Sequence, residues 1–137
     1  MRQLLGVLCT QFFRNGERVS LLEIIDEFTL PILPAPIDFE SYFEVEMPGE
    51  LEPLERTARI DVVGPDGVVI GHTDDLRVQP KQWEGRAAVM SFHVSCTVDV
   101  RAAGPHEIRL VIEETVVAWR EFSVFERGKR PVELSDR

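Results

Sequence analysis

The chain is poor in the features that mark secreted scaffolds and membrane proteins. It has two cysteines among its 137 residues, too few for a disulfide framework. No stretch approaches the roughly 18 consecutive apolar residues of a membrane span, and the apolar run after Arg2 is shorter than the roughly 7 to 15 residues of a signal-peptide core. We therefore expect a cytoplasmic protein with free thiols that does not contact a membrane.

Positive charge is also scarce. The 15 basic side chains stand against 24 acidic ones, which gives a formal net charge of -9 and an isoelectric point near 4.8. Because such a field repels phosphate groups, nucleic acid and anionic membrane surfaces are poor partners. The length of the chain is that of one domain with its own core.

Helical periodicity is missing from most of the chain, and short apolar runs separated by turn signals take its place. The clearest turn signal is Gly64-Pro65-Asp66-Gly67, in which the proline fixes a turn torsion and the second glycine accepts a positive φ. It predicts a hairpin. The most regular strand pattern covers residues 90–100, where apolar and polar side chains alternate. The expected inward residues are Met90, Phe92, Val94, Cys96, Val98 and Val100.

The N-terminal segment is predicted to be a second hairpin. Asn15-Gly16 joins two apolar segments and suits a two-residue turn. Residues 18–28 also fit a helix, because a capping-box pattern and helical apolar spacing occur there, but the strand character of the rest of the chain favours a strand. Three prolines within residues 31–36 exclude a helix and predict an extended crossing between sheets.

The last predicted strand runs from Thr115 to Phe125 and changes its apolar parity on the way. Trp119 lies on one parity and Phe122 on the other. This change predicts a bulge near Arg120 and Glu121, and it places the Trp119 side chain in the core.

Together these patterns predict an all-β fold. About eight strands with turns between them, and no internal repeat, indicate an antiparallel immunoglobulin-like β-sandwich. We expect a single sandwich domain over residues 1–126 and a polar C-terminal tail over residues 127–137. A closed or partly open β-barrel is the alternative, and a barrel would make an internal ligand cavity plausible.

Five segments of turns and core positions form a pattern that spans nearly the whole chain. They are Leu5-Gly6-Val7-Leu8-Cys9, Arg18 to Asp26, Pro31 to Pro36, Val62 to Gly67 and Ala103 to Ile108. This pattern resembles an uncharacterised family of small bacterial proteins that is catalogued as a domain of unknown function. Members often have an acidic residue after the cysteine and a glycine in the second strand, where this chain has Thr10 and Glu23. The resemblance implies a bacterial immunoglobulin-like sandwich and brings no activity, substrate or catalytic residues.

The histidines offer little sign of a metal or catalytic site. His72 with Asp74 and Asp75 is the best cluster, because imidazole and carboxylate groups in one turn could hold a divalent ion, but a solvated loop is the commoner explanation. Cys96 lies three residues after a histidine on one predicted strand, so the two side chains point to opposite faces. His106 follows a turn proline and is expected on the surface.

Other signatures of an enzyme are also missing. The serines lie in no Gly-x-Ser-x-Gly elbow, and no glycine loop precedes a helix that could hold a phosphate. Glu40, Tyr42, Glu44 and Glu46 share one parity of a predicted strand, which we interpret as a solvated face because paired carboxylates act as acid and base only when one is desolvated. We expect no enzymatic activity and no cofactor.

The apolar residues suggest protein contacts. Residues 4–13 and 19–28 carry apolar side chains on both faces of the predicted strands, whereas a sandwich strand normally has one face in contact with solvent. A loop, the tail or a second chain must therefore cover the second apolar face. Leu5 and Phe13 are the interface candidates in this region. Trp83, in a loop, is the third, because an exposed indole is typical of an interface anchor. Burial of this indole under the loop, as a plug for the end of the sandwich, is the favoured alternative.

The sequence thus predicts a non-enzymatic binding or assembly module that contacts a protein partner and can form a homodimer. The alternative is a small-ligand or metal-binding protein of barrel-like form, or less readily a hydrolase, with His72, Asp74 and Asp75 at the mouth of its cavity.

Overall fold

The computed structural model describes residues 1–16, 18–47, 55–78 and 88–128. Within these ranges the chain forms ten β-strands and no α-helix. The strands are β1 (Arg2–Asn15), β2 (Arg18–Ile25), β3 (Glu27–Leu30), β4 (Ala35–Met47), β5 (Arg56–Val63), β6 (Val69–His72), β7 (Leu76–Val78), β8 (Ala88–Val100), β9 (Gly104–Ile112) and β10 (Thr115–Glu126).

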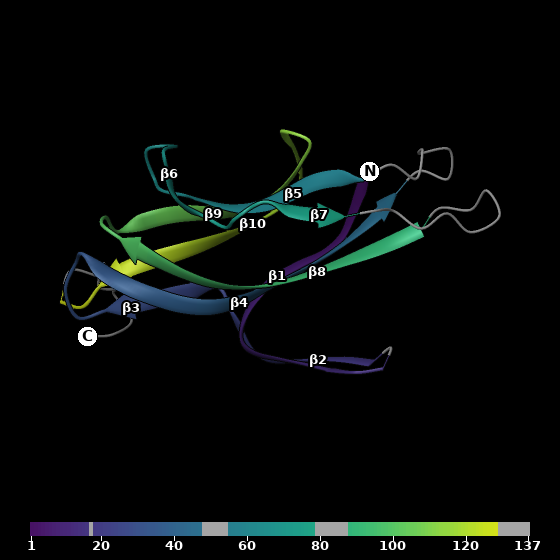
Figure 1. Ribbon diagram of the computed structural model, residues 1–137. Coiled ribbons are helices and arrows are strands. Elements are labelled where there is room, and N and C mark those ends of the chain that lie inside the picture. The colour runs from purple at the N-terminus through teal and green to yellow at the C-terminus, as the bar shows by residue number, and fades with distance from the viewer. Residues whose placement is uncertain (17, 48–54, 79–87, 129–137) are drawn as a thin grey trace.

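The strands form two sheets that pack face to face (Figure 1). Sheet A has the order β2-β1-β4-β8, and sheet B has the order β3-β10-β9-β5-β6, with β7 also paired to β5. Neighbouring strands are antiparallel, except that β3 runs parallel to β10. The prediction of an all-β sandwich is therefore confirmed, with ten strands in the described residues where about eight were predicted. The barrel alternative is wrong, because the described strands divide into two separate sheets.

The core lies between the two sheets and follows the predicted alternation. Phe92, Cys96, Val98 and Val100 of β8 point inward and are buried. At the centre three aromatic rings meet with centroids 5.6 to 6.1 Å apart. These rings belong to Phe28, Phe39 and Phe122.

The predicted turns and the predicted crossing are confirmed. In the turn between β5 and β6, the Gly67 N–H donates to the Gly64 carbonyl at 3.0 Å and the Gly64 N–H to the Val68 carbonyl at 2.9 Å. Gly67 has a φ of 81°, which glycine adopts without a Cβ penalty. Residues 18–25 form a strand that pairs with β1 across the Asn15-Gly16 turn. The proline-rich segment carries the chain from β3 in sheet B to β4 in sheet A.

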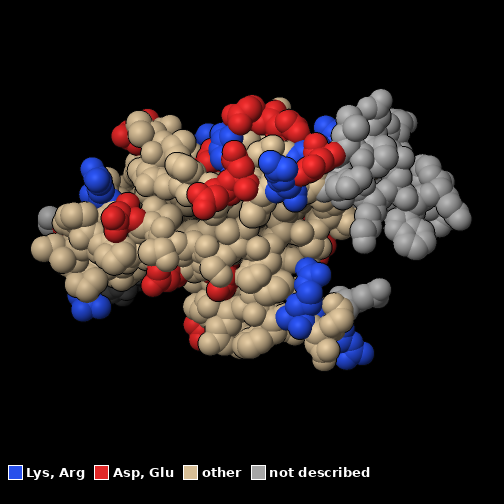
Figure 2. Space-filling view, viewed as in Figure 1, with Lys and Arg blue, Asp and Glu red and all other residues tan. Residues whose placement is uncertain are grey.

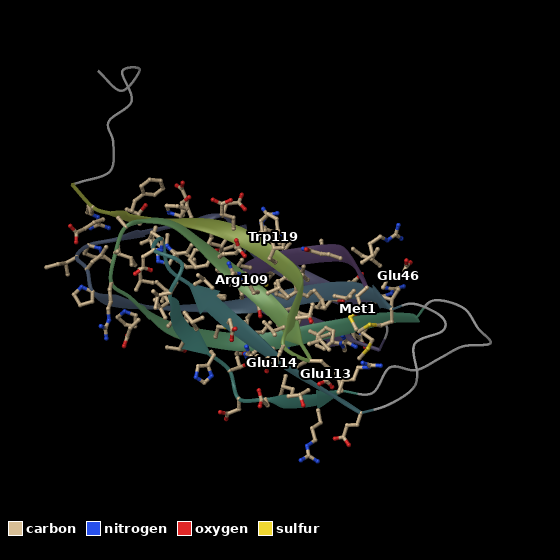
Figure 3. All side chains as sticks on the ribbon, turned by 90° about the horizontal axis from the view of Figure 1, so that it is seen from above. Met1, Glu46, Arg109, Glu113, Glu114 and Trp119 are labelled. Atoms are coloured by element: carbon tan, nitrogen blue, oxygen red, sulfur yellow. The ribbon has the colours of Figure 1, made fainter. Side chains whose placement is uncertain are left out.

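The bulge in β10 lies earlier than predicted, and this moves Trp119. The register with β9 shifts between Val116 and Ala118, so Ala118 and Phe122 both face the core and Trp119 points outward, 51% exposed. The core position predicted for Trp119 is wrong. Its backbone is held by Gln3, whose side-chain amide donates to the Trp119 carbonyl at 2.8 Å and accepts from the Trp119 N–H at 3.0 Å. Figure 3 shows Trp119 beside Arg109, its partner on β9.

Two further burial predictions are wrong. His106 was expected at the surface, but it shares the inward parity of β9 with Ile108 and Leu110 and is only 2% exposed. Its ring stacks on Phe122 with a centroid separation of 5.3 Å. Tyr42 was expected on a wet face, and it does lie on the outer face of sheet A, yet it is also 2% exposed, because another part of the chain covers it.

Some predicted features fall outside the described residues. They are Trp83 and residues 129–137 of the expected tail. Strand β10 ends at Glu126, next to the predicted boundary of the tail. In the described ranges, no helix has the length and apolar character needed to cross a membrane.

Candidate functional site

The N-terminal hairpin forms an arm that separates from the sandwich. Strand β1 pairs with β4 from Arg2 to Cys9 and with β2 from Leu8 to Asn15. Its second half therefore leaves β4 and continues with β2 as a two-stranded ribbon, which we call the arm (residues 10–25). In Figure 1 the arm lies beneath β4 and β8, on the outer side of sheet A.

One side of the arm packs on sheet A through Phe12. The Phe12 ring stacks on His93 with centroids 3.8 Å apart and an interplanar angle of 13°, and its centroid is 5.3 Å from that of Tyr42. Tyr42 and His93 are direct cross-strand partners on β4 and β8. The Arg14 guanidinium lies 5.9 Å from the centre of the Phe12 ring. The arm therefore covers the outer face of sheet A and accounts for the burial of Tyr42.

Polar contacts on sheet A hold the two rings on which Phe12 packs. Glu40 Oε2 accepts a hydrogen bond from the Ser95 hydroxyl at 2.6 Å and lies 2.8 Å from His93 Nε2. The Tyr42 hydroxyl donates to Glu44 at 2.8 Å, and burial raises the pKa of Tyr42 above its ordinary value. These carboxylates lie on β4, which is a central strand. These hydrogen bonds therefore fix the positions of the His93 and Tyr42 rings that contact Phe12.

The other side of the arm is apolar and exposed. Phe13, Leu22 and Ile24 are 53%, 48% and 50% exposed. The register pairs Phe13 with Ser20 and Gln11 with Leu22, and directly paired residues point to the same side of an antiparallel ribbon. We call the surface of Phe13, Leu22 and Ile24 the outer arm face. Three half-exposed apolar side chains on one small ribbon make this surface a candidate for contact with a partner.

The arm also has an open strand edge and little net charge. Strand β2 is at the edge of sheet A, and among the described strands it pairs with β1 alone. Residues 10–25 contain two arginines and two glutamates, so their formal charge is zero, against -9 for the whole chain. Figure 2 shows the lobe at the bottom as mostly tan, while red side chains gather over the top of the molecule. A free edge without strong charge is suited to pairing with another strand.

The structure brings only part of the predicted interface together. Phe13 is on the outer arm face, whereas Leu5 lies opposite Glu44 on sheet A and is 37% exposed. Sequence reasoning did not single out Leu22 and Ile24. The apolar character of both parities in this segment was the signal that could have identified them.

A second candidate region lies where β6 of sheet B faces β8 of sheet A. A hollow of about 670 Å³ opens between these strands, and a smaller one of about 350 Å³ adjoins it. His72 lines both, Asp74 lines the smaller one and Asp75 lines neither. The His72 Nδ1 atom is 3.1 Å from the Thr73 carbonyl oxygen. In the described part of the chain, no three histidine, cysteine, aspartate or glutamate side chains are grouped so that they could hold a metal ion.

The larger hollow contains a buried imidazole. His106 Nδ1 is 3.0 Å from the Gly104 carbonyl oxygen, so Nδ1 carries the proton and donates it, which leaves Nε2 as an acceptor in the neutral ring. Burial lowers the pKa of His106 below its ordinary value, and the nearby Asp66 carboxylate opposes this shift. The His106 imidazole and the Asp66 side chain therefore both line the larger hollow.

No protein-family model and no curated protein matches this chain. Among solved structures, it is similar to the Pseudomonas fluorescens alkylpurine DNA glycosylase AlkC bound to DNA with an abasic site analog, with 13% identity and a TM-score of 0.40 over 73% of this chain and 28% of that one. It is also similar to a CARDB domain from Pyrococcus furiosus in complex with di-metal ions, with 12% identity and a TM-score of 0.35 over 88% of this chain and 86% of that one.

Proposed function

We propose that this protein is a non-enzymatic assembly module whose arm joins it to a second copy of the chain. The observation that carries the proposal is the outer arm face, where Phe13, Leu22 and Ile24 are each about half exposed. The opposite side of the arm is already packed on sheet A through Phe12. The exposed side is therefore the one available to a partner.

A second copy fits this surface in charge and in geometry. Most of the molecule is strongly acidic, so two copies repel each other in most orientations. The arm has no formal net charge, and contact between two arms brings together the least acidic parts of both chains. Strand β2 can pair with β2 of the partner about a two-fold axis, as closed dimers commonly do, and this pairing would satisfy the open edge.

We place this assembly in the cytoplasm. Both cysteines, Cys9 and Cys96, are free thiols and both are buried. Free thiols are the usual state in a reducing compartment. This supports the location expected from the sequence.

Native mass spectrometry of the full chain tests the proposal. The wild type should be a dimer, and Leu22→Glu and Ile24→Glu should each weaken the dimer about tenfold or more, because each places an unpaired carboxylate in the contact. Val116→Glu is the matched control, since Val116 is 44% exposed on a strand of the other sheet. Circular dichroism checks that each variant keeps its fold.

Three results would overturn the proposal. They are a monomeric wild type, a dimer that survives both arm substitutions, and a dimer that the control substitution dissociates equally well. The third result would place the contact outside the arm.

A further inference from the structure

The larger hollow lies at one end of the sandwich, between strands that belong to different sheets. The β5–β6 turn and the segment between β8 and β9 lie at this same end (Figure 1). Its volume of about 670 Å³ is within the range of about 300 to 1,000 Å³ that is typical of small-molecule sites. It does not touch the arm, so it is independent of the proposed assembly function.

The walls of the hollow combine apolar surface with a few polar groups. Pro65, Ile70 and Val98 provide apolar wall. Gly71 faces Val98 closely, because a Cβ at Gly71 would lie 3.2 Å from a Val98 methyl group. A larger residue at Gly71 would meet Val98. The glycine therefore allows β6 and β8 to approach at this edge.

Two of the polar groups that line the hollow, His106 and Asp66, can accept hydrogen bonds. His106 Nε2 is the acceptor atom of a side chain that is only 2% exposed. Asp66 lines the same hollow, and its Oδ1 accepts from the Val68 N–H at 3.2 Å, which leaves the second carboxylate oxygen for a ligand. A ligand that donates more than one hydrogen bond would therefore complement the imidazole acceptor and the carboxylate in this hollow.

The charge of the lining favours a cation. Asp66 and Asp99 are acidic and Arg101 is basic, so the lining has a net negative charge. Asp99 and Arg101 also line a neighbouring hollow beside Pro34 and Pro36, which places both at the boundary between the two. Asp66 lies on the exposed β5–β6 turn at the rim of the larger hollow, and His106 is buried in its wall. Such a lining disfavours phosphate and carboxylate ligands.

We propose that the larger hollow binds a small organic ammonium ion. Its N–H groups donate to His106 Nε2 and to the free oxygen of Asp66, and its apolar body lies against Ile70 and Val98. A metal ion would need a third ligand, and none is grouped with these two among the described residues.

The probe is n-pentylammonium, titrated into the full-length protein at pH 7 and followed by amide chemical shifts and calorimetry. Binding should shift the amides of residues 64–72 and 97–106. The uncharged 1-pentanol should bind at least tenfold more weakly, because it has a single donor and no charge. Pentanoate should not bind, because it has no donor and carries the wrong charge.

Substitutions decide whether Asp66 makes the contact. Asp66→Asn keeps an oxygen that can accept from Val68 but removes the charge, so it should weaken pentylammonium binding about tenfold to a hundredfold. Asp75→Asn is the matched control, since Asp75 lines neither hollow and should leave the affinity unchanged. No binding, equal binding of pentanol, or equal loss in the two variants would overturn the proposal. None of these results depends on the oligomeric state.

Discussion

Replacing Phe12 by alanine should release the arm from the sandwich without unfolding the core. The Phe12 ring stacks on His93 with centroids 3.8 Å apart and is tilted against Tyr42 with centroids 5.3 Å apart. Aromatic contacts of this kind contribute about 0.5 to 1.5 kcal/mol each. The Arg14 guanidinium adds a cation–π contact of about 0.5 kcal/mol. The substitution should therefore cost about 2 kcal/mol of local stability.

Native-state hydrogen exchange measures this cost strand by strand. Amides of the arm open locally, and their exchange rate follows the free energy of that opening. A loss of about 2 kcal/mol raises the rate about 30-fold. Amides in β9, at the centre of sheet B, should keep their protection, because Phe12 makes no ring contact there.

A neighbouring phenylalanine provides the control. Phe13 follows directly in sequence but points to the opposite side of the arm and is 53% exposed, so Phe13→Ala should change local stability by less than about 0.5 kcal/mol. Both variants are made with Leu22→Glu, so that contact between two arms cannot protect their amides. Equal acceleration in the two variants, or no acceleration in the Phe12 variant, would refute the docking of the arm on sheet A.

Two further predictions concern buried groups. Because burial lowers the pKa of His106 below the ordinary 6.5, the unfolded chain binds this proton more readily, so the free energy of unfolding should fall as the pH falls through about 6.5. Urea denaturation at several pH values should show a smaller decrease for His106→Gln, and equal decreases would contradict the buried ring. Burial also raises the pKa of Cys96 to about 11 and that of Cys9 above its ordinary value. Iodoacetamide at pH 8 should therefore modify neither thiol in the folded protein and both in urea, as intact mass will show; modification of the folded protein would contradict their burial.

The fold was predictable because each strand carries its own signal. The alternation in β8 identifies the buried set of Phe92, Cys96 and Val98 without any knowledge of the partner strands. The turn at Gly64 to Gly67 is likewise a local feature, fixed by residue types that adopt its torsions. The change of sheet after β3 follows from the prolines, which prevent the chain from continuing a ladder.

The errors arise where a residue's environment is set by distant parts of the chain. The β10 bulge could have satisfied the apolar parity at either of two places, and the structure has it beside Ala118, where the backbone of Trp119 meets the side chain of Gln3. Tyr42 has the parity of a wet face and is buried only because Phe12 covers it. No local pattern around Tyr42 reports the position of the arm.

Strand β8 contributes residues to both proposed surfaces, one on each of its two faces. Its His93 side chain points outward and supports the arm, whereas its Val98 side chain points inward and forms a wall of the larger hollow. Alternation along a strand separates such roles, because neighbouring positions face different layers. Loss of the dimer would leave the acceptors of His106 and Asp66 in place, and failure to bind an ammonium ion would leave the outer arm face exposed. The two proposals therefore rest on different side chains of one rigid sandwich, and each can be judged by its own experiment.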